Sequence, residues 1–378
     1  MTELENWNVY NPSGKHRVLV TKELPGNEWL SILMAADYRI EVCTSKEILS
    51  KEKLIERIGN NCKAVIGQLT EKWDAELFEV LRKAGGLTYC NYAVGYDNVD
   101  VMSATQNYIS IGNTPGVLTE TTAEMAVALT MACSRKIVEA DGFTRRGNFE
   151  GWLPSLFLGK RLWRSTVGII GAGRIGSAYA LMMIKAFQMN LIYFDNQRNI
   201  KLEKEIEAYN EYLEKTGCLP VTVNNVHSVD EVLTKADVVS LHIPLTKETH
   251  HLISQKELLT MKTDAVLINT SRGPIIAEAA LAQHCKTHPD FTAGLDVFEQ
   301  EPVVHEDLKQ LPNITITPHI ASATSWTREN MAKLAALNIK GVIEDYPAWD
   351  QGQIEPFLKP VPPKAIPSII NQSVLTAK

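Results

Sequence analysis

The sequence lacks a hydrophobic run long enough to cross a membrane. No stretch of its 378 residues approaches the ~18 consecutive apolar residues that a transmembrane helix needs, so we expect no membrane contact. It also lacks an excess of basic residues. The formal net charge is −6, which argues against a nucleic-acid-binding protein but leaves room for a local site for a small anion.

Cysteine is scarce and scattered. The six cysteines form no C-x-x-C pair and have no histidine spacing typical of zinc, so we predict no metal site and reduced thiols in a cytosol-like compartment. The first residues, MTELENWNVYNPSG, lack the pattern of a secretory or transit peptide. The final Thr-Ala-Lys differs from the Ser-Lys-Leu type of peroxisomal signal. These observations predict a cytoplasmic protein.

Residues 166–176, TVGIIGAGRIG, form the most informative pattern in the chain. Residues 166–170 predict a buried strand, and a helix follows the glycines. Gly171 allows a tight turn, Gly173 lets a pyrophosphate approach the backbone, and Gly176 lets the helix pack on the strand. The first N–H groups of that helix would face the phosphates. The pattern predicts a dinucleotide-binding site.

An acidic residue completes this pattern. Asp195 stands at the end of the next apolar run, about 20 residues after the third glycine, where a carboxylate accepts hydrogen bonds from the adenosine ribose. It would repel a 2′-phosphate, which favours NAD(H) over NADP(H). Arg198 lies close by and is compatible with a 2′-phosphate, so the cofactor preference stays open at this point.

The wider chain alternates between strand and helix patterns, which predicts an α/β protein with two Rossmann-like, doubly wound parallel sheets and a cleft between them. We expect a discontinuous substrate-binding domain, residues 1–125 and 325–378, and an NAD-binding domain, residues 126–324. Long helices at 119–138 and 327–345 are expected to bridge the two domains. The proline-rich tail, 346–378, is expected to cross the surface or to be disordered, and the charged helix 201–215 to be a solvated insertion or a partner-binding or gating element.

Three ionisable residues follow predicted strands of the second sheet. Arg272 follows AVLIN, Glu301 follows GLDVF, and His319 follows ITITP. The carboxyl ends of parallel strands are where ligands bind in such sheets. Each residue alone has an ordinary structural explanation, but their shared edge predicts that they converge near the nicotinamide.

These motifs resemble a known family. NTSRG at 269–273, GLDVF at 294–298, EQEP at 299–302 and PHI at 318–320 resemble the D-isomer-specific 2-hydroxyacid dehydrogenases, over residues 60–345. Within the family, VGYDNVD at 94–100, NTPGV at 113–117 and EGWLP at 150–154 are similar to hydroxypyruvate and glyoxylate reductases. The insertion after Asp195 is most similar to the NADH-dependent reductases of plant photorespiration.

The resemblance implies a role for each residue of the substrate site. The Arg272 guanidinium would hold the substrate's carboxylate and carbonyl oxygen, and the N–H groups around Val94 and Gly95 would receive the other carboxylate oxygen. His319 would donate a proton to the carbonyl oxygen as hydride arrives. Glu301 would orient the imidazole and favour its charged form.

The resemblance also implies which residues line the cofactor. Asp296 would anchor the nicotinamide amide, close to Arg272 and His319. The remaining cofactor residues would be Arg174, Ile175, Pro244, Thr270 and Ser271. For Thr270 and Ser271, capping of the strand end is an equally good interpretation.

Trp152 has two interpretations. It would wall the substrate pocket of the partner subunit in a homodimer, or it would be a local packing anchor.

The expected activity is NADH-dependent reduction of hydroxypyruvate to D-glycerate and of glyoxylate to glycolate. One alternative is another D-2-hydroxyacid dehydrogenase, of the D-lactate or phosphoglycerate type. The other is an NADH-sensing corepressor on the same fold, because a fold does not fix a function.

Overall fold

The computed structural model describes residues 6–375 and divides into two compact units. Unit 1 comprises Met1–Leu118 and Ala323–Lys378, and unit 2 comprises Thr119–Ser322. The first five and last three residues lie outside the described part, so the expectations placed on the two termini are not addressed by the structure. The boundary expected at residue 125 falls inside helix α5 (Thr119–Ser134), and the units divide where that helix begins.

Unit 1 contains a six-stranded sheet in the order β1-β3-β2-β4-β5-β6. Its strands are β1 (Trp7–Tyr10), β2 (His16–Val20), β3 (Tyr38–Cys43), β4 (Ala64–Gly67), β5 (Thr88–Asn91) and β6 (Ser110–Gly112). Its helices are α1 (Glu28–Ala35), α2 (Lys51–Ile58), α3 (Ala75–Lys83), α4 (Val101–Gln106), α13 (Ser325–Ile343) and α14 (Glu355–Leu358). The strands run parallel except β1, which pairs antiparallel with β3 at the sheet edge. This edge strand was not predicted from the sequence.

The proline-rich tail was expected to cross the surface or to be disordered, and over residues 346–375 the structure shows an ordered segment, so the alternative of disorder is wrong there. Ile366 and Ile369 are buried against Val342 of α13. The Asn371 side chain accepts a hydrogen bond from the Ile111 N–H of β6 (2.7 Å) and donates one to the carbonyl of Ile109 (2.9 Å). A few buried anchors therefore hold a segment whose overall composition is typical of a loop.

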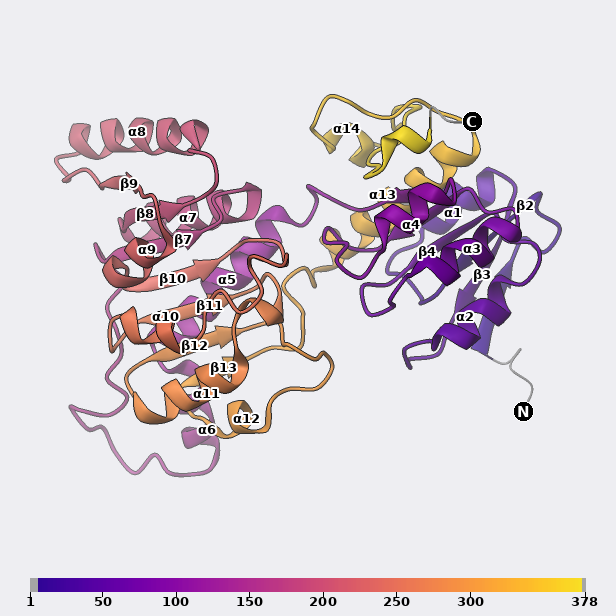
Figure 1. The fold of residues 1–378 in the computed structure, drawn as a ribbon. Helices are drawn as coiled ribbons and strands as arrows, with labels where there is room; N and C mark the ends of the chain where they lie inside the picture. The colour runs from indigo at the N-terminus through magenta and orange to yellow at the C-terminus, as the bar shows by residue number, and fades with distance from the viewer. Residues whose placement is uncertain (1–5, 376–378) are drawn as a thin grey trace. The chain divides into compact units, whose positions relative to one another are not determined.

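Unit 2 contains a seven-stranded parallel sheet in the order β13-β12-β11-β10-β7-β8-β9. Its strands are β7 (Thr166–Ile170), β8 (Asn190–Phe194), β9 (Val223–Asn225), β10 (Val238–Leu241), β11 (Val266–Asn269), β12 (Thr292–Leu295) and β13 (Ile314–Ile316). Its helices are α5, α6 (Ile137–Arg145), α7 (Arg174–Phe187), α8 (Ile200–Lys215), α9 (Val229–Lys235), α10 (Gln255–Thr260), α11 (Glu278–Thr287) and α12 (Glu306–Gln310). Figure 1 shows helices on both faces of this sheet. Two hydrophobic cores line it, as a doubly wound sheet requires.

The single helix expected at 119–138 is two helices. Helix α5 ends at Ser134, and Lys136 takes a left-handed conformation (φ 52°) before α6 begins at Ile137. A left-handed residue interrupts the helical hydrogen bonds, so the chain turns there.

The order of strands in unit 2 reverses between β7 and β10. From β7 the chain continues to β8 on one side, and β10 then lies on the other side of β7. The carboxyl ends of two such strands flank a crevice, which is the usual ligand position in open parallel sheets. The glycine-rich loop, residues 171–176, follows β7 directly. It therefore stands at this switch point.

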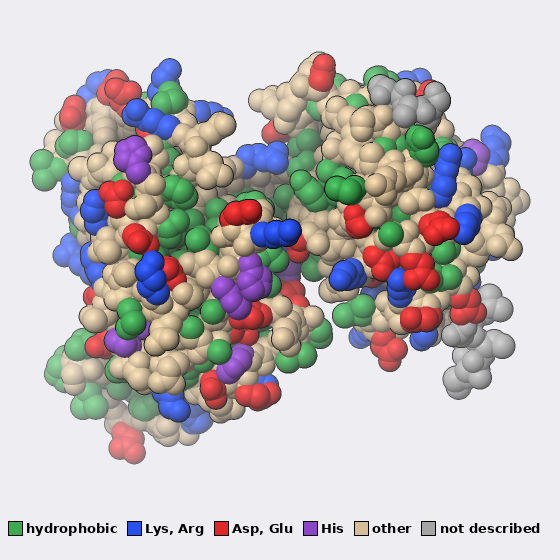
Figure 2. Space-filling model, in the orientation of Figure 1, with side chains coloured by type: hydrophobic (Ala, Val, Ile, Leu, Met, Phe, Trp, Pro, Cys, Tyr) green, Lys and Arg blue, Asp and Glu red, His purple; other side chains and the backbone are tan. Residues whose placement is uncertain are grey.

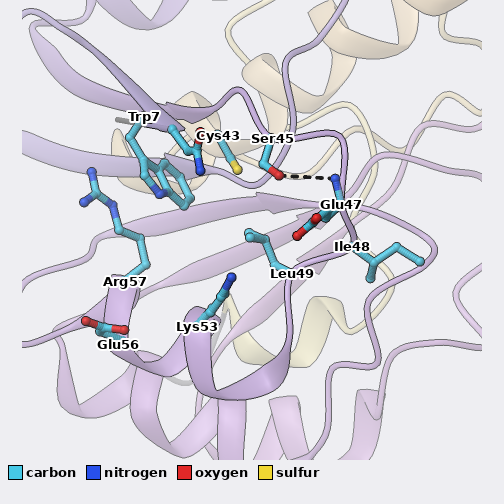
Figure 3. Close-up of a pocket in the computed structure, with 10 residues that line it drawn as sticks. Trp7, Cys43, Ser45, Glu47, Ile48, Leu49, Lys53, Glu56 and Arg57 are labelled. Carbon is cyan, nitrogen blue, oxygen red and sulfur yellow. Dashed lines mark hydrogen bonds between the residues drawn. The ribbon is translucent and has the colours of Figure 1, made fainter. Parts of the chain in front are cut away.

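A cavity of about 350 Å³ lies in unit 1, beside β1 and α2 (Figure 3). Trp7, Cys43, Lys53 and Arg57 line it, and the Arg57 guanidinium stacks over the Trp7 ring, 4.4 Å from its centroid. It contains none of the residues that the sequence singled out for chemistry.

The described residues include no helix long and apolar enough to span a membrane. On the face shown in Figure 2, acidic and basic side chains are interspersed over both units. That face therefore carries no extended patch of one charge sign.

Candidate active site

Each glycine of the loop after β7 has the environment that a dinucleotide turn requires. Gly171 has φ 93°, and a Cβ there would lie 2.6 Å from the His242 carbonyl oxygen. A Cβ at Gly176 would lie 2.1 Å from the Gly171 carbonyl oxygen, so the start of α7 packs directly on the turn. A Cβ at Gly173 would meet nothing within 4 Å. Packing therefore requires glycine at positions 171 and 176, whereas Gly173 leaves open space for a ligand.

Helix α7 begins immediately after Gly173 and has no side-chain cap. Its first N–H groups are therefore available to an anion, which the helix dipole also favours. In this first turn Arg174 is exposed and Ile175 is half-buried. The residues present fit a pyrophosphate.

Asp195 follows β8, the strand next to β7, and its side chain is half-buried. Its Oδ1 accepts a hydrogen bond from the Gln197 N–H (3.4 Å), which leaves most of the carboxylate's accepting capacity unused by that bond. A carboxylate at the end of this strand fits the ribose hydroxyls of a bound dinucleotide.

His319 and Glu301 form the hydrogen bond that the sequence predicted. His319 Nδ1 lies 2.7 Å from Glu301 Oε2, and both side chains are about a quarter exposed. The other oxygen, Glu301 Oε1, accepts from the Phe298 N–H at 3.0 Å. With Nδ1 engaged by the carboxylate, Nε2 is the ring nitrogen left for another partner.

The backbone at His319 is in the left-handed region, with φ 53°. This conformation is uncommon for a residue with a side chain and persists only where the surroundings impose it. The neighbouring hydrogen bonds supply that constraint: the His319 N–H donates to the Asp296 carbonyl at 2.8 Å.

Asp296 fixes the loop that carries His319. Its fully buried carboxylate accepts from Thr317 Oγ1 (2.6 Å) and from the N–H groups of Ile320 (2.8 Å) and Ala321 (2.7 Å). Burial raises the pKa of Asp296, and these hydrogen bonds oppose that shift. The sequence suggested a nicotinamide anchor, whereas the structure shows a side chain engaged in holding residues 317–321.

Arg272 follows β11, the strand between β10 and β12. Asn269 Nδ2 donates to the Arg272 carbonyl (2.8 Å), and Arg272 Nη1 donates to the Ser271 carbonyl (2.8 Å). A Cβ at Gly273 would lie 1.9 Å from the Phe298 carbonyl oxygen. The Arg272 turn therefore packs on the turn that leads to Glu301.

Thr270 and Ser271 differ in how their hydroxyl groups are used. Ser271 Oγ donates to Asn269 Oδ1 (2.7 Å), which is the strand-end capping that the sequence left open. Thr270 Oγ1 is buried and, within the described part of the chain, has no hydrogen-bond partner. A buried hydroxyl without a partner beside a dinucleotide sheet fits contact with a bound molecule. Pro244, in the loop after β10, is exposed.

Two further glutamates stabilise the turn that carries Glu301. The Glu278 N–H donates to Glu299 Oε1 (2.6 Å), and the Glu299 N–H donates to Glu278 Oε1 (2.7 Å). Burial raises the pKa of Glu278. Sequence reasoning missed this reciprocal pair, because the two residues are distant in the chain and nothing local marks them.

Val94 and Gly95 belong to unit 1. The Val94 carbonyl accepts from Asn113 Nδ2 (2.9 Å), and the Gly95 carbonyl accepts from Asn91 Nδ2 (2.8 Å). Their own N–H groups donate to no acceptor among the described residues.

Trp152, in unit 2, is 80% exposed, so it is not a local packing anchor within the described chain.

Comparison with known proteins identifies the family of the chain. The family domain described as D-isomer specific 2-hydroxyacid dehydrogenase, NAD binding domain, matches residues 127–321. A glycerate dehydrogenase of Cucumis sativus is 54% identical over 97% of each chain. A relative from Arabidopsis thaliana, named a peroxisomal glycerate dehydrogenase, is 53% identical over 97% of this chain and 96% of its own.

More distant matches point the same way. A glyoxylate reductase of Korarchaeum cryptofilum is 40% identical over 91% of this chain and 96% of its own. The crystal structure of the TT0316 protein from Thermus thermophilus is similar with a TM-score of 0.78 and 35% identity, over 94% of this chain and 99% of that one. The fold, the NAD(H)-binding loop and these relatives together show that the chain belongs to the D-isomer specific 2-hydroxyacid dehydrogenase family of oxidoreductases.

Proposed function

We propose that the protein reduces hydroxypyruvate to D-glycerate, and glyoxylate to glycolate, with NADH. The observation that carries the proposal is the 2.7 Å hydrogen bond between His319 and Glu301 at the carboxyl ends of unit 2's strands, next to the strand that presents Arg272. The names of the relatives, glycerate dehydrogenase and glyoxylate reductase, support the choice of substrates. Removal of hydride and a proton from the 2-hydroxyl position of glycerate gives hydroxypyruvate, so the reverse reaction reduces hydroxypyruvate.

Each residue has one task in this reaction. The hydride that the carbonyl carbon accepts would come from NADH when it is bound at the glycine-rich loop. His319 Nε2 gives a proton to the carbonyl oxygen, so the ketone or aldehyde becomes an alcohol. Glu301 holds Nδ1 and so orients the imidazole, with Nε2 left for the substrate. Arg272 holds the carboxylate, because its planar guanidinium can donate two parallel hydrogen bonds.

The remaining site residues are part of the same proposal. The N–H groups of Val94 and Gly95 have no acceptor among the described residues, and the function in carboxylate binding that the resemblance implies for them stays a prediction. The ribose would bind Asp195, and Thr270 Oγ1 would find its missing partner on the cofactor. Asp296 would act at the cofactor through the loop that it holds, because its fully buried carboxylate accepts hydrogen bonds from Thr317, Ile320 and Ala321.

The location of the protein in the cell stays a prediction. The sequence argument favoured the cytoplasm, whereas the relative from Arabidopsis thaliana is named peroxisomal.

A substrate panel tests the activity directly. NADH oxidation should be fastest with hydroxypyruvate or glyoxylate, and slower with pyruvate and 3-phosphohydroxypyruvate. It is followed by the loss of absorbance of the reduced nicotinamide. Fastest turnover with pyruvate or the phosphorylated acid would replace the proposed substrate, and no turnover with any of the four would favour a sensing function.

His319→Ala should lower kcat by about 100-fold or more, because the proton donor is lost, while the affinity for NADH stays within error. Steady-state kinetics and NADH fluorescence titration measure the two effects. The exposed His227→Ala, also in unit 2, is the matched control and should behave as wild type. Undiminished turnover in the His319 variant would remove this residue from the proton path.

Arg272→Lys should raise the KM for hydroxypyruvate by about 10-fold, because an ammonium group keeps the charge but cannot form the two parallel bonds. Arg146→Lys, an exposed position of unit 2, controls for loss of an arginine as such. A wild-type KM in the Arg272 variant would contradict the carboxylate clamp.

We also propose a homodimer. Unit 2 exposes large apolar side chains along one irregular segment, with exposed fractions of 58% for Phe149, 80% for Trp152 and 60% for Leu153. Such neighbours usually pack against a partner chain. Sedimentation velocity should give one species of twice the 42.1 kDa chain mass, and Trp152→Ser with Leu153→Ser should shift it towards monomer. A monomeric wild-type protein would refute the dimer.

A further inference from the structure

Arg198, the residue that left the cofactor preference open, is engaged by a neighbouring carboxylate. Its Nε donates to Glu203 Oε1 (2.9 Å) and Oε2 (3.0 Å), and its Nη2 donates to Oε2 (2.8 Å). The arginine is largely exposed, with 63% of its side chain accessible, whereas only 18% of the Glu203 side chain is accessible. This forked arrangement directs the guanidinium at Glu203.

Glu203 is itself held in place by a buried tyrosine. The hydroxyl of Tyr193, a fully buried residue of β8, donates to Glu203 Oε1 at 2.7 Å. The same hydroxyl accepts from the Asn199 N–H at 3.0 Å. The Arg198 guanidinium lowers the pKa of Glu203, so this carboxylate stays ionised at neutral pH. Glu203 is therefore a fixed anion.

The backbone beside Arg198 is tied to the glycine-rich loop. Asn199 caps α8 by accepting from the Leu202 N–H (2.9 Å). Its Nδ2 donates to the carbonyl of Ala172 (2.7 Å) and to Ser177 Oγ (3.0 Å). In Figure 1, α8 lies at the end of unit 2 where β8 and β9 form the edge of the sheet. Arg198 thus lies in the chain between Asp195 and Asn199, which is hydrogen-bonded to the glycine-rich loop. The position of its positive charge therefore depends on the conformation of the Arg198 side chain.

An arginine near the acidic residue of a dinucleotide site is the usual partner of a 2′-phosphate. We propose that Glu203 is a specificity-determining residue that holds the Arg198 guanidinium and so withholds it from the 2′-phosphate of NADP(H). This inference rests on the proposed preference for NADH, in which Asp195 repels the phosphate. Asp195 then repels the 2′-phosphate, and Glu203 keeps the Arg198 guanidinium from attracting it. The helical insertion after Asp195 thereby acquires a function at the cofactor site.

The pair differs from the ordinary charge pairs of the same helix. Lys201 and Glu205 approach only to 3.9 Å, and Lys215 and Glu211 to 4.0 Å, which is beyond hydrogen-bond distance. Within the described part of the chain, neither Glu205 nor Glu211 accepts a hydrogen bond from a buried tyrosine as Glu203 does from Tyr193. Glu205 therefore offers a charge-matched control on α8.

The test measures binding without turnover. Calorimetric titration gives the Kd of ADP-ribose and of 2′-phospho-ADP-ribose for the whole protein. Glu203→Gln should tighten 2′-phospho-ADP-ribose by about 3- to 5-fold and leave ADP-ribose unchanged, as expected for release of a partly exposed ion pair. Glu205→Gln should change neither. In kinetics, the Glu203 variant should lower the KM for NADPH and leave kcat unchanged.

Arg198→Ala provides the second variant. In the wild-type background it should change neither Kd, because the guanidinium is already withheld, and in the Glu203→Gln background it should abolish the gain. Two results would overturn the inference: an unchanged Kd for 2′-phospho-ADP-ribose in Glu203→Gln, or a gain that survives loss of Arg198.

Failure of the proposed NADH preference would look different. In that case the wild-type protein would bind the two probes equally, and Asp195→Ala would not improve 2′-phospho-ADP-ribose relative to ADP-ribose. A wild-type preference for ADP-ribose that depends on Asp195 but not on Glu203 would keep the proposed cofactor and reject the function of Glu203.

Discussion

The hydrogen bond between Glu301 and His319 is the interaction on which the proposed chemistry depends. It selects which imidazole nitrogen is left for a substrate, and it couples the turns after β12 and β13. Neither turn is held by that bond alone. Asp296 fixes residues 317–321 through a fully buried carboxylate, and the reciprocal Glu278–Glu299 pair fixes the turn before Glu301. A strained backbone at His319 is stable in this setting because every neighbouring segment is constrained.

Much of the fold could be predicted from the sequence because most strands of unit 2 are short apolar runs separated by helical patterns. The glycine-rich loop was the clearest case, since Gly171 has a positive φ that favours glycine and Gly176 packs directly on the Gly171 carbonyl oxygen, five residues earlier. Strand β1 could not be predicted, because its four residues acquire a partner only by pairing with β3. The ordered tail was missed for the same reason: Ile366, Ile369 and Asn371 are anchors only in the presence of α13 and β6.

In the site too, features set by the nearby sequence could be predicted, and features set by contacts between distant residues could not. Arg272, Glu301 and His319 stand where the strand pattern predicted, because the ends of neighbouring parallel strands share one edge of the sheet. The function of the Asp296 side chain could not be predicted, since its partners lie on the next strand's loop. Arg198 illustrates the limit most clearly. Its position suggested a phosphate ligand, and only the structure shows that Glu203, itself hydrogen-bonded by Tyr193, accepts from its guanidinium.

A crystal structure of the protein with NADH and oxamate, an unreactive analogue of the substrate, tests the central claim most directly. The account predicts His319 Nε2 within hydrogen-bond distance of the oxamate carbonyl oxygen, Nδ1 still bonded to Glu301, and the Arg272 guanidinium on the carboxylate. An analogue bound with the imidazole directed elsewhere, or with its carboxylate held by a different cation, would contradict it.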